Sequence, residues 1–241
     1  MTKHNISAAS VKKLSALLLT CAGLILIAPV LWPEMDLTVS GWFYRPGEGF
    51  PLARQPILVA LHWLATIGVR FYVVFLLIAL GLSHFKREPF LGIKRRGWLF
   101  VLLGLLLAPG LIANVTFKDH WGRARPHEVT EFGGSHPFSP ALVPQENARS
   151  NGSFVAGDPS FGFYLSSFGY VVAPNRSRRF FWGGMGSGVL LGLTRIAMGA
   201  HFLSDVLFAA LFMLAATAGL HMVMFGSKKT KHYWRIWLSG R

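Results

Sequence analysis

The sequence contains little cysteine and few charged residues. Cys21 is the single cysteine among 241 residues, which excludes an intramolecular disulfide and a cysteine-based metal cluster. Charged residues make up 14% of the chain, against about 25% in an ordinary soluble domain. Apolar residues make up 52%, and no internal repeat is present. The composition therefore indicates a membrane protein rather than a soluble domain.

Acidic residues are especially scarce. Ten Asp and Glu stand against 24 Lys and Arg, which gives a formal charge of +14. The sequence nevertheless lacks a basic surface interleaved with aromatic residues, the usual sign of nucleic-acid binding. We therefore expect the lipid bilayer as partner and no nucleic acid, and no motif indicates an obligate protein partner.

Apolar runs predict an all-α fold with six transmembrane helices. A spanning helix needs about 20 mainly apolar residues. Four runs fit this length: 14–32, 98–117, 181–198 and 202–225. Two more spans are expected at 69–84 and 161–174. We expect residues 56–68 to form a separate interfacial helix, because Arg70 at mid-membrane would cost about 3 kcal/mol.

Basic residues cluster on every second connection between these spans. The clusters are Lys3 with Lys12 and Lys13, then 86–96, 176–179 and 228–241. By the positive-inside rule these connections and both termini are cytoplasmic. The opposite, outer face then holds 33–68, 118–160 and 199–201.

The whole chain, 1–241, reads as one integral-membrane domain. Residues 1–33 are predicted to be an uncleaved N-terminal membrane anchor, because no small-x-small cleavage site follows the apolar run. Residues 226–241 are predicted to form a basic cytoplasmic tail.

Three ionisable residues interrupt the last two apolar runs: Arg195, His201 and Asp205. Asp205 follows His201 by one helical turn, so the two side chains can meet. A break at Gly199-Ala200 would bring Arg195 to the same place. A histidine oriented by a carboxylate and facing a cation suits a nucleophile or a proton carrier. The alternative is a polar cluster that only braces a helical hairpin.

A second cluster, "KDHWGRARP", follows the third span and emerges on the same outer face. It places Lys118, Arg123 and Arg125 within eight residues, although basic residues are usually depleted on that side. Guanidinium groups match phosphate oxygens in bidentate fashion, and lysine adds a point charge. The cluster predicts a bound anion, with anchoring to lipid headgroups as the alternative.

Together these patterns resemble a known family. The Lys-x6-Arg-Pro pattern at Lys118–Pro126 and the Arg-x5-His-x3-Asp pattern at Arg195–Asp205 are similar to signature motifs of the type-2 phosphatidic acid phosphatases. This family shares a helical core with the vanadium haloperoxidases, and the similarity covers about residues 60–220. The resemblance implies a metal-independent phosphatase without a cofactor, in which His201 attacks phosphorus and Asp205 orients His201.

The resemblance also implies how the phosphate is held. Lys118, Arg125 and Arg195 would bind its non-bridging oxygens, and Arg123 is expected to add a further cation. Three fixed cations can stabilise a phosphoryl group in transfer as a metal does elsewhere.

The family's middle motif is altered in this sequence. The family has Ser-Phe-Pro-Ser-Gly-His, and residues 153–158 read Ser-Phe-Val-Ala-Gly-Asp. Gly157 is kept and is expected at the phosphate, whereas Asp158 stands where the family has its general acid. We predict Asp158 as the proton donor. Three histidines of the same outer region are alternatives: His120, His127 and His136.

The predicted enzyme removes a phosphate from a membrane lipid through a phosphohistidine. Resemblance to bacterial envelope phosphatases makes lipid A the first choice, acted on at the periplasmic face of the inner membrane. Undecaprenyl diphosphate and phosphatidylglycerophosphate are alternative substrates. A lipid phosphotransferase would use the same residues, and the altered middle motif leaves a non-catalytic lipid-phosphate binding or transport protein as a third hypothesis.

Overall fold

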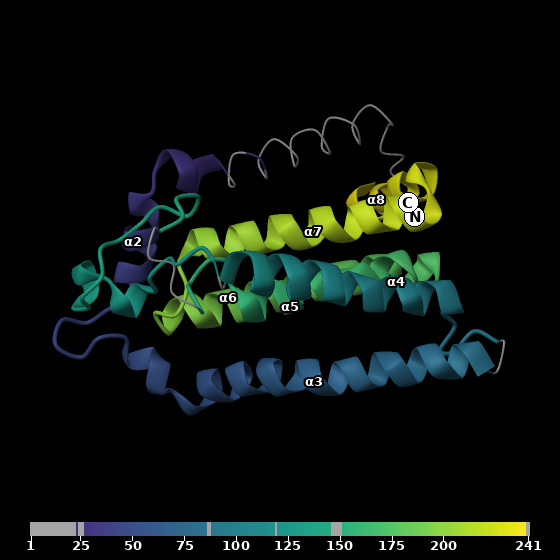
Figure 1. Cartoon of the computed structure of the whole chain (residues 1–241), viewed down its shortest axis with the longest axis horizontal. Coiled ribbons are helices and arrows are strands. Elements are labelled where there is room, and N and C mark those ends of the chain that lie inside the picture. Colours follow the sequence, from purple (N-terminus) through teal and green to yellow (C-terminus); the bar gives the residue numbers. More distant parts are fainter. Residues whose placement is uncertain (1–22, 24–26, 86–87, 119, 146–150, 240–241) are drawn as a thin grey trace, which may run out of the picture.

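The computed structural model describes residues 23, 27–85, 88–118, 120–145 and 151–239, and the named elements among them are all helical (Figure 1). The longer elements are α2 (Glu34–Gly41), α3 (Pro56–Phe85), α4 (Arg95–Leu105), η2 (Leu106–Lys118), α5 (Gly157–Tyr164), η5 (Leu165–Tyr170), α6 (Pro174–Ala197), α7 (Leu203–Phe225) and α8 (Ser227–Ser239). Three short turns complete the set: η1 (Pro51–Arg54), η3 (Pro126–Glu128) and η4 (Thr130–Phe132).

Three helices among the described residues have the length and composition to cross a membrane: α3, α4 continued by η2, and α7. Two of them coincide with the predicted spans 98–117 and 202–225. In η2 the helix winds more widely, with hydrogen bonds that reach five residues back. Pro109 lies inside this segment, and its missing N–H prevents regular α-helical bonding there.

The predicted division between 56–68 and 69–84 is wrong, because α3 is one continuous helix of 30 residues. No proline follows Pro56 within it, and Gly68 alone does not break a helix. A helix of this length reaches about 45 Å, more than the roughly 30 Å hydrocarbon core. Arg70 is exposed, and its long side chain can extend toward the headgroups.

The structure also differs from the prediction of one spanning helix over 161–174. This range corresponds to α5 and η5, which are eight and six residues long, shorter than the about 20 residues of a spanning helix. Their small and aromatic side chains are mostly buried against other helices. Residues 181–197 of the predicted span 181–198 lie within α6, which is not one of the three membrane-crossing candidates, whereas most of 14–32 lies outside the described residues. The count of six spans therefore stays a prediction.

Glycines set the spacing between α5, η5 and α6. A Cβ atom on Gly162 would lie 2.6 Å from Gly188, and one on Gly184 would lie 2.1 Å from the Ser166 nitrogen. Only residues without a side chain permit such close packing. This contact brings the C-terminal end of α6 beside the N-terminal end of α5.

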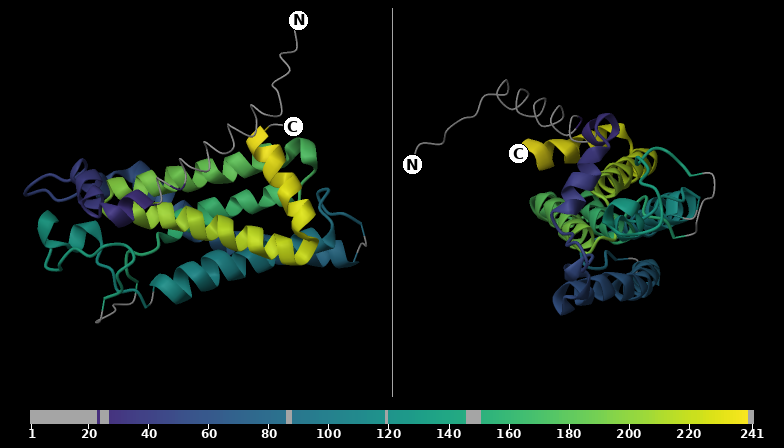
Figure 2. Two further views of the ribbon diagram at one scale, coloured as in Figure 1. Left: turned by 90° about the horizontal axis from the view of Figure 1, so that it is seen from above. Right: turned by 90° about the vertical axis from the view of Figure 1, so that its left-hand side faces the viewer.

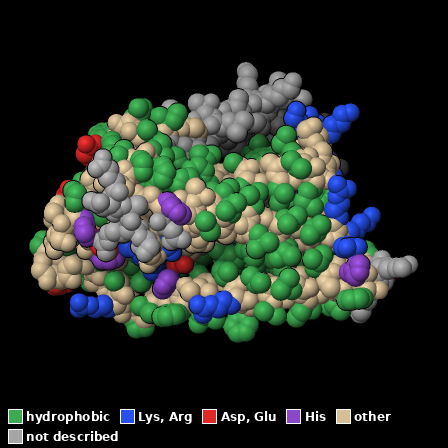
Figure 3. Space-filling view, viewed as in Figure 1, with side chains coloured by type: hydrophobic (Ala, Val, Ile, Leu, Met, Phe, Trp, Pro, Cys, Tyr) green, Lys and Arg blue, Asp and Glu red, His purple; other side chains and the backbone are tan. Residues whose placement is uncertain are grey.

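The helices form an elongated bundle with different ends (Figures 1 and 2). Helix α3 runs along one edge, whereas α2 and the loop before α5 cover one end and α8 lies at the other. Apolar side chains cover most of the bundle between the ends, and Lys and Arg gather at the end that carries α8 (Figure 3). This arrangement is typical of a protein whose middle contacts lipid.

Candidate active site

A cavity of about 590 Å³ opens at the end of the bundle opposite α8. It lies where η2, α5 and α6 meet α3 and the turn between α6 and α7. The structure places six of the predicted site residues on its wall: Lys118, Arg125, Gly157, Asp158, Arg195 and His201. They come from distant parts of the chain, and the fold brings them to one space.

The cations reach the cavity from three sides. Lys118 is the last residue of η2, and its Nζ lies 3.5 Å from where a Cβ on Gly157 would be. Arg195 lies in the last turn of α6. Arg125 comes from the loop after η2, where its guanidinium donates to the Asn151 side-chain oxygen over 3.1 Å. The first turn of α5, which begins at Gly157, also borders the cavity, and helix N-termini favour anions.

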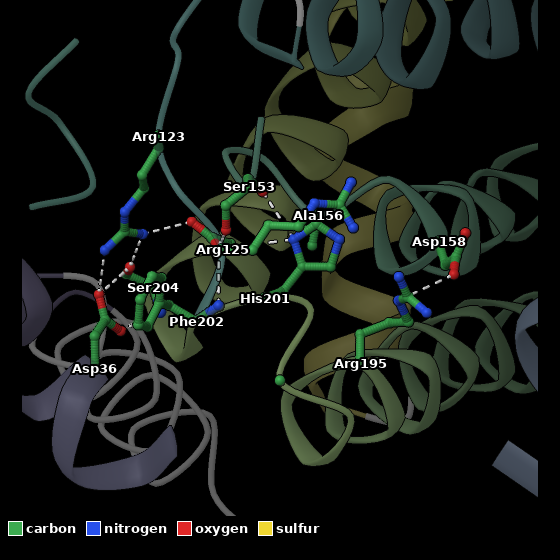
Figure 4. Close-up of polar contacts among 12 residues, drawn as sticks. Asp36, Arg123, Arg125, Ser153, Ala156, Asp158, Arg195, His201, Phe202 and Ser204 are labelled. Carbon is green, nitrogen blue, oxygen red and sulfur yellow. Dashed lines mark hydrogen bonds and ion pairs between the residues drawn. The ribbon is translucent and has the colours of Figure 1, made fainter. Parts of the chain in front are cut away.

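His201 is held by a backbone carbonyl rather than directly by a carboxylate. Its Nδ1 donates to the Ser153 oxygen over 2.8 Å, whereas Asp205 Oδ2 is 3.7 Å from the same nitrogen, beyond hydrogen-bond distance. The acceptor fixes the proton on Nδ1, so that Nε2 keeps its lone pair. In Figure 4 this second nitrogen faces the guanidinium groups of Arg125 and Arg195.

Asp205 acts on His201 through its neighbours. Its Oδ2 accepts hydrogen bonds from the Ser153 hydroxyl and from the Phe202 backbone nitrogen, the latter over 2.8 Å. These two residues belong to the segments that hold the imidazole, since Ser153 provides its acceptor and Phe202 follows it in the chain. Asp205, in the first turn of α7, thus bonds to both segments that hold His201.

Arg123 does not line the cavity, and our expectation that it binds phosphate is corrected. Its guanidinium is 1% exposed and donates to Asp205, to the Ser204 hydroxyl and to Asp36. Its Nε donates to the Ser139 oxygen over 2.9 Å. With its donors engaged inside the protein, Arg123 joins α2, the loop before α5 and α7, as Figure 4 shows for its contacts with Asp36 and Ser204.

Asp36 is a site-supporting residue that the sequence analysis missed. It is 1% exposed, and besides Arg123 it accepts from the Ser204 backbone nitrogen over 2.8 Å. Burial raises the pKa of the Asp36 carboxyl, although the Arg123 guanidinium opposes this shift. Its only signal was its place among apolar residues just after the first predicted span.

His62 is the second residue that was missed. It projects from α3 into the cavity, and its Nδ1 lies 2.6 Å from Asp158 Oδ2. The same carboxylate oxygen is 3.5 Å from Arg195 Nε. The prediction that residues 56–68 form a separate interfacial helix hid this placement, because an interfacial histidine would not reach α5.

The three loop histidines considered as proton donors lie elsewhere. His120 is exposed and contacts the Val115 oxygen, and His127 contacts the Gly199 oxygen over 2.8 Å. The His136 backbone nitrogen donates to the Glu128 oxygen. None of these three histidines is among the residues that line the cavity.

Comparisons with known proteins identify the family of this chain. Residues 97–229, more than half of the chain, match the model of the PAP2 superfamily. The chain belongs to this family of type-2 phosphatidic acid phosphatases. The resemblance inferred from the two motifs is confirmed, and so is the prediction of a hydrolase: this PAP2 protein is a phosphoric monoester hydrolase.

Curated relatives within the PAP2 superfamily share one name, lipid A 4'-phosphatase. The protein of Francisella tularensis subsp. novicida (strain U112) is 34% identical over 83% of this chain and 90% of its own length. The Rhizobium etli protein is 32% identical over 75% of this chain and 68% of its own length. The Rhizobium leguminosarum protein is 36% identical over 53% of this chain and 55% of its own length. No solved structure matches the chain. This PAP2 protein is therefore a membrane lipid phosphatase.

Burial determines the protonation state of His201 in this PAP2 site. The imidazole is 3% exposed, and burial lowers its pKa from 6.5 to about 4. Asp205 opposes the shift, whereas Arg195 and Arg125 add to it. His201 is therefore neutral near pH 7, as a nitrogen nucleophile must be.

This pKa predicts two pH effects. The acidic limb of kcat/KM that reports His201 should lie near pH 4 instead of near 6.5. Since the folded protein holds this proton less tightly than the unfolded chain, stability should also fall as pH falls from about 6.5 to about 4. Rates and apparent unfolding temperatures measured over pH 3.5–8 test both. An acidic limb at pH 6.5 that reports His201 would contradict a buried imidazole that is neutral near pH 7.

Proposed function

We propose that this protein removes the 4'-phosphate of lipid A at the outer face of the membrane through a phosphohistidine on His201. One observation carries the proposal. His201 uses Nδ1 to bond the Ser153 carbonyl, which leaves Nε2 for the cavity that Arg125 and Arg195 also line. The names of three curated relatives support the substrate.

The cavity suits a phosphoryl group. Lys118, Arg125 and Arg195 surround it and would hold the non-bridging oxygens, where negative charge must be stabilised during transfer. The N-terminus of α5 at Gly157 would add backbone N–H donors. With the phosphate so placed, His201 Nε2 attacks phosphorus in line with the leaving oxygen, and water then hydrolyses the phosphohistidine.

The rest of the cavity suits a lipid. Apart from the charged groups its wall is mainly apolar, with Trp63 and Val73 from α3, Leu106 from η2 and Phe161 from α5. Only 17% of the apolar 18-residue stretch that makes α3 a candidate membrane span is buried inside the protein. A lipid could therefore keep its acyl chains beside α3 while its phosphorylated headgroup reaches Arg125 and Arg195.

The charge distribution supports the orientation. Lys and Arg gather at the α8 end (Figure 3), and such an end faces the cytoplasm by the positive-inside rule. The cavity lies at the other end, so the active site would face the periplasm of a bacterial inner membrane. The C-terminal helix α8 would then be cytoplasmic.

A substrate panel tests the function. The purified protein in detergent with EDTA is incubated with lipid A bisphosphate, with the 1- and 4'-monophosphates, and with undecaprenyl diphosphate and phosphatidylglycerophosphate. We expect release of phosphate from the 4' position only, read by mass spectrometry, with no loss of rate in EDTA. Preferential release from another lipid would replace lipid A as the substrate. Transfer of the phosphate to an added lipid alcohol without free phosphate would indicate a phosphotransferase.

A further inference from the structure

We propose that His62 is the general acid and base of this site and that Asp158 positions it. The inference rests on the proposed function and assigns the proton donor that the sequence analysis placed on Asp158. It adds α3, a helix without a recognised motif, to the catalytic machinery.

The geometry places His62 and the nucleophile in one cavity. His62 and His201 line the same cavity from α3 and from the turn before α7. The His62 side chain is 30% exposed, so the imidazole is accessible from the cavity. Its Nδ1 contacts Asp158, and Nε2 is the nitrogen left to exchange a proton with substrate or water.

Asp158 is engaged as an acceptor instead of a donor. Its Oδ2 lies 2.6 Å from His62 Nδ1 and 3.5 Å from Arg195 Nε. Arginine has only N–H donors, so Arg195 can pair with this oxygen only as a cation, and an oxygen paired in this way accepts the hydrogen bond of the His62 Nδ1–H. A group with this role has no proton to give to a leaving oxygen. A carboxylate bonded to one imidazole nitrogen does, however, fix the tautomer and steady the imidazolium.

Both half-reactions balance with this assignment. In the first, His201 Nε2 forms a bond to phosphorus as the bond to the leaving oxygen breaks, and protonated His62 gives its Nε2 proton to that oxygen. The products are an alcohol, phosphohistidine and neutral His62. In the second, neutral His62 takes a proton from water as the water oxygen bonds to phosphorus and the P–N bond breaks. Inorganic phosphate leaves, and His62 is protonated again.

Leaving-group dependence separates this role from a structural one. A sugar hydroxyl is a poor leaving group and needs a proton, whereas 4-nitrophenolate departs without one. General acid catalysis contributes about 10²- to 10⁴-fold. His62→Gln should therefore lose at least about 10²-fold in kcat/KM on the lipid A 4'-monophosphate and less than about 5-fold on 4-nitrophenyl phosphate.

The matched control is His84→Gln, an exposed histidine near the other end of the same helix. Its rates should equal those of wild type on both substrates. Asp158→Asn should show the same selectivity as His62→Gln with a smaller loss on the lipid, since it keeps an acceptor but removes the charge. Activity on 4-nitrophenyl phosphate reports in each variant that the fold and His201 are intact.

Two results would overturn the assignment while leaving the proposed function in place. An equal loss of His62→Gln on both substrates would mean that His62 holds substrate or braces α3. Unchanged rates on both would mean that it takes no part. If wild type releases phosphate from neither substrate, the proposed function and this inference fail together.

Discussion

His201→Ala is expected to release phosphate at least about 10⁴-fold more slowly than wild type, because it removes the nucleophile itself. The cations and the cavity would still bind substrate, so KM should change much less than kcat. Steady-state assays on the lipid A 4'-monophosphate and on 4-nitrophenyl phosphate test this. Unlike His62→Gln, the variant should lose activity on both substrates, since both need the attacking nitrogen.

A second substitution separates chemistry from packing. His201→Asn keeps a side-chain N–H that can donate to the Ser153 carbonyl in place of Nδ1, yet it has no nucleophilic ring nitrogen. It should be as inactive as His201→Ala while unfolding near the wild-type temperature. His120→Ala, an exposed histidine at the same end, is the control and should keep full activity. Activity in His201→Asn above one hundredth of wild type would contradict nucleophilic catalysis by His201.

Arg123→Met is expected to cause the largest loss of stability, about 3–5 kcal/mol. The reason is that Asp36 and Asp205, which are 1% and 0% exposed, would both lose their buried cation. The measurement is the apparent unfolding temperature in detergent. Arg45→Met is the matched control, because the Arg45–Glu48 pair is largely exposed and such pairs contribute about 0–1 kcal/mol.

The loss of stability caused by Arg123→Met should depend on pH. Burial raises the pKa of Asp36 even with Arg123 in place, and removing the guanidinium would raise it further. Since the folded variant then binds this proton more tightly than the unfolded chain, its stability should recover as pH falls. The difference in unfolding temperature between the variant and wild type should therefore narrow as pH falls. A variant as stable as wild type at every pH would show that the cluster carries no net stabilisation.

Short motifs on the ends of helices predicted much of this site. The spacing of His201 and Asp205 indicated that both lie at one turn, and the predicted break at Gly199-Ala200 falls between α6 and α7, where Arg195 and His201 line the same cavity. These relations are local, so helical periodicity and chain reversal suffice to infer them. The two long helices at 98–117 and 202–225 followed in the same way from apolar length.

The residues that contact these motif residues could not be predicted in this way, because they come from distant segments of the chain. Asp36 reaches Ser204 across 168 positions, and His62 reaches Asp158 across 96. Residues so far apart in the chain are not related by helical periodicity, so the sequence pattern does not pair them. Arg123 illustrates the resulting error: beside Arg125 it looked like a second phosphate ligand, but an unrecognised acid on α2 turns it into the interior.

The most direct test of the mechanism is to trap the intermediate. The enzyme is mixed with lipid A carrying ³²P at the 4' position, quenched within milliseconds in alkaline denaturant, where phosphohistidine survives, and digested for peptide mapping. We predict label on the peptide that contains His201, released by acid and absent in His201→Asn. Burst release of phosphate with no label at any quench time, or label on another residue, would contradict the phosphohistidine mechanism.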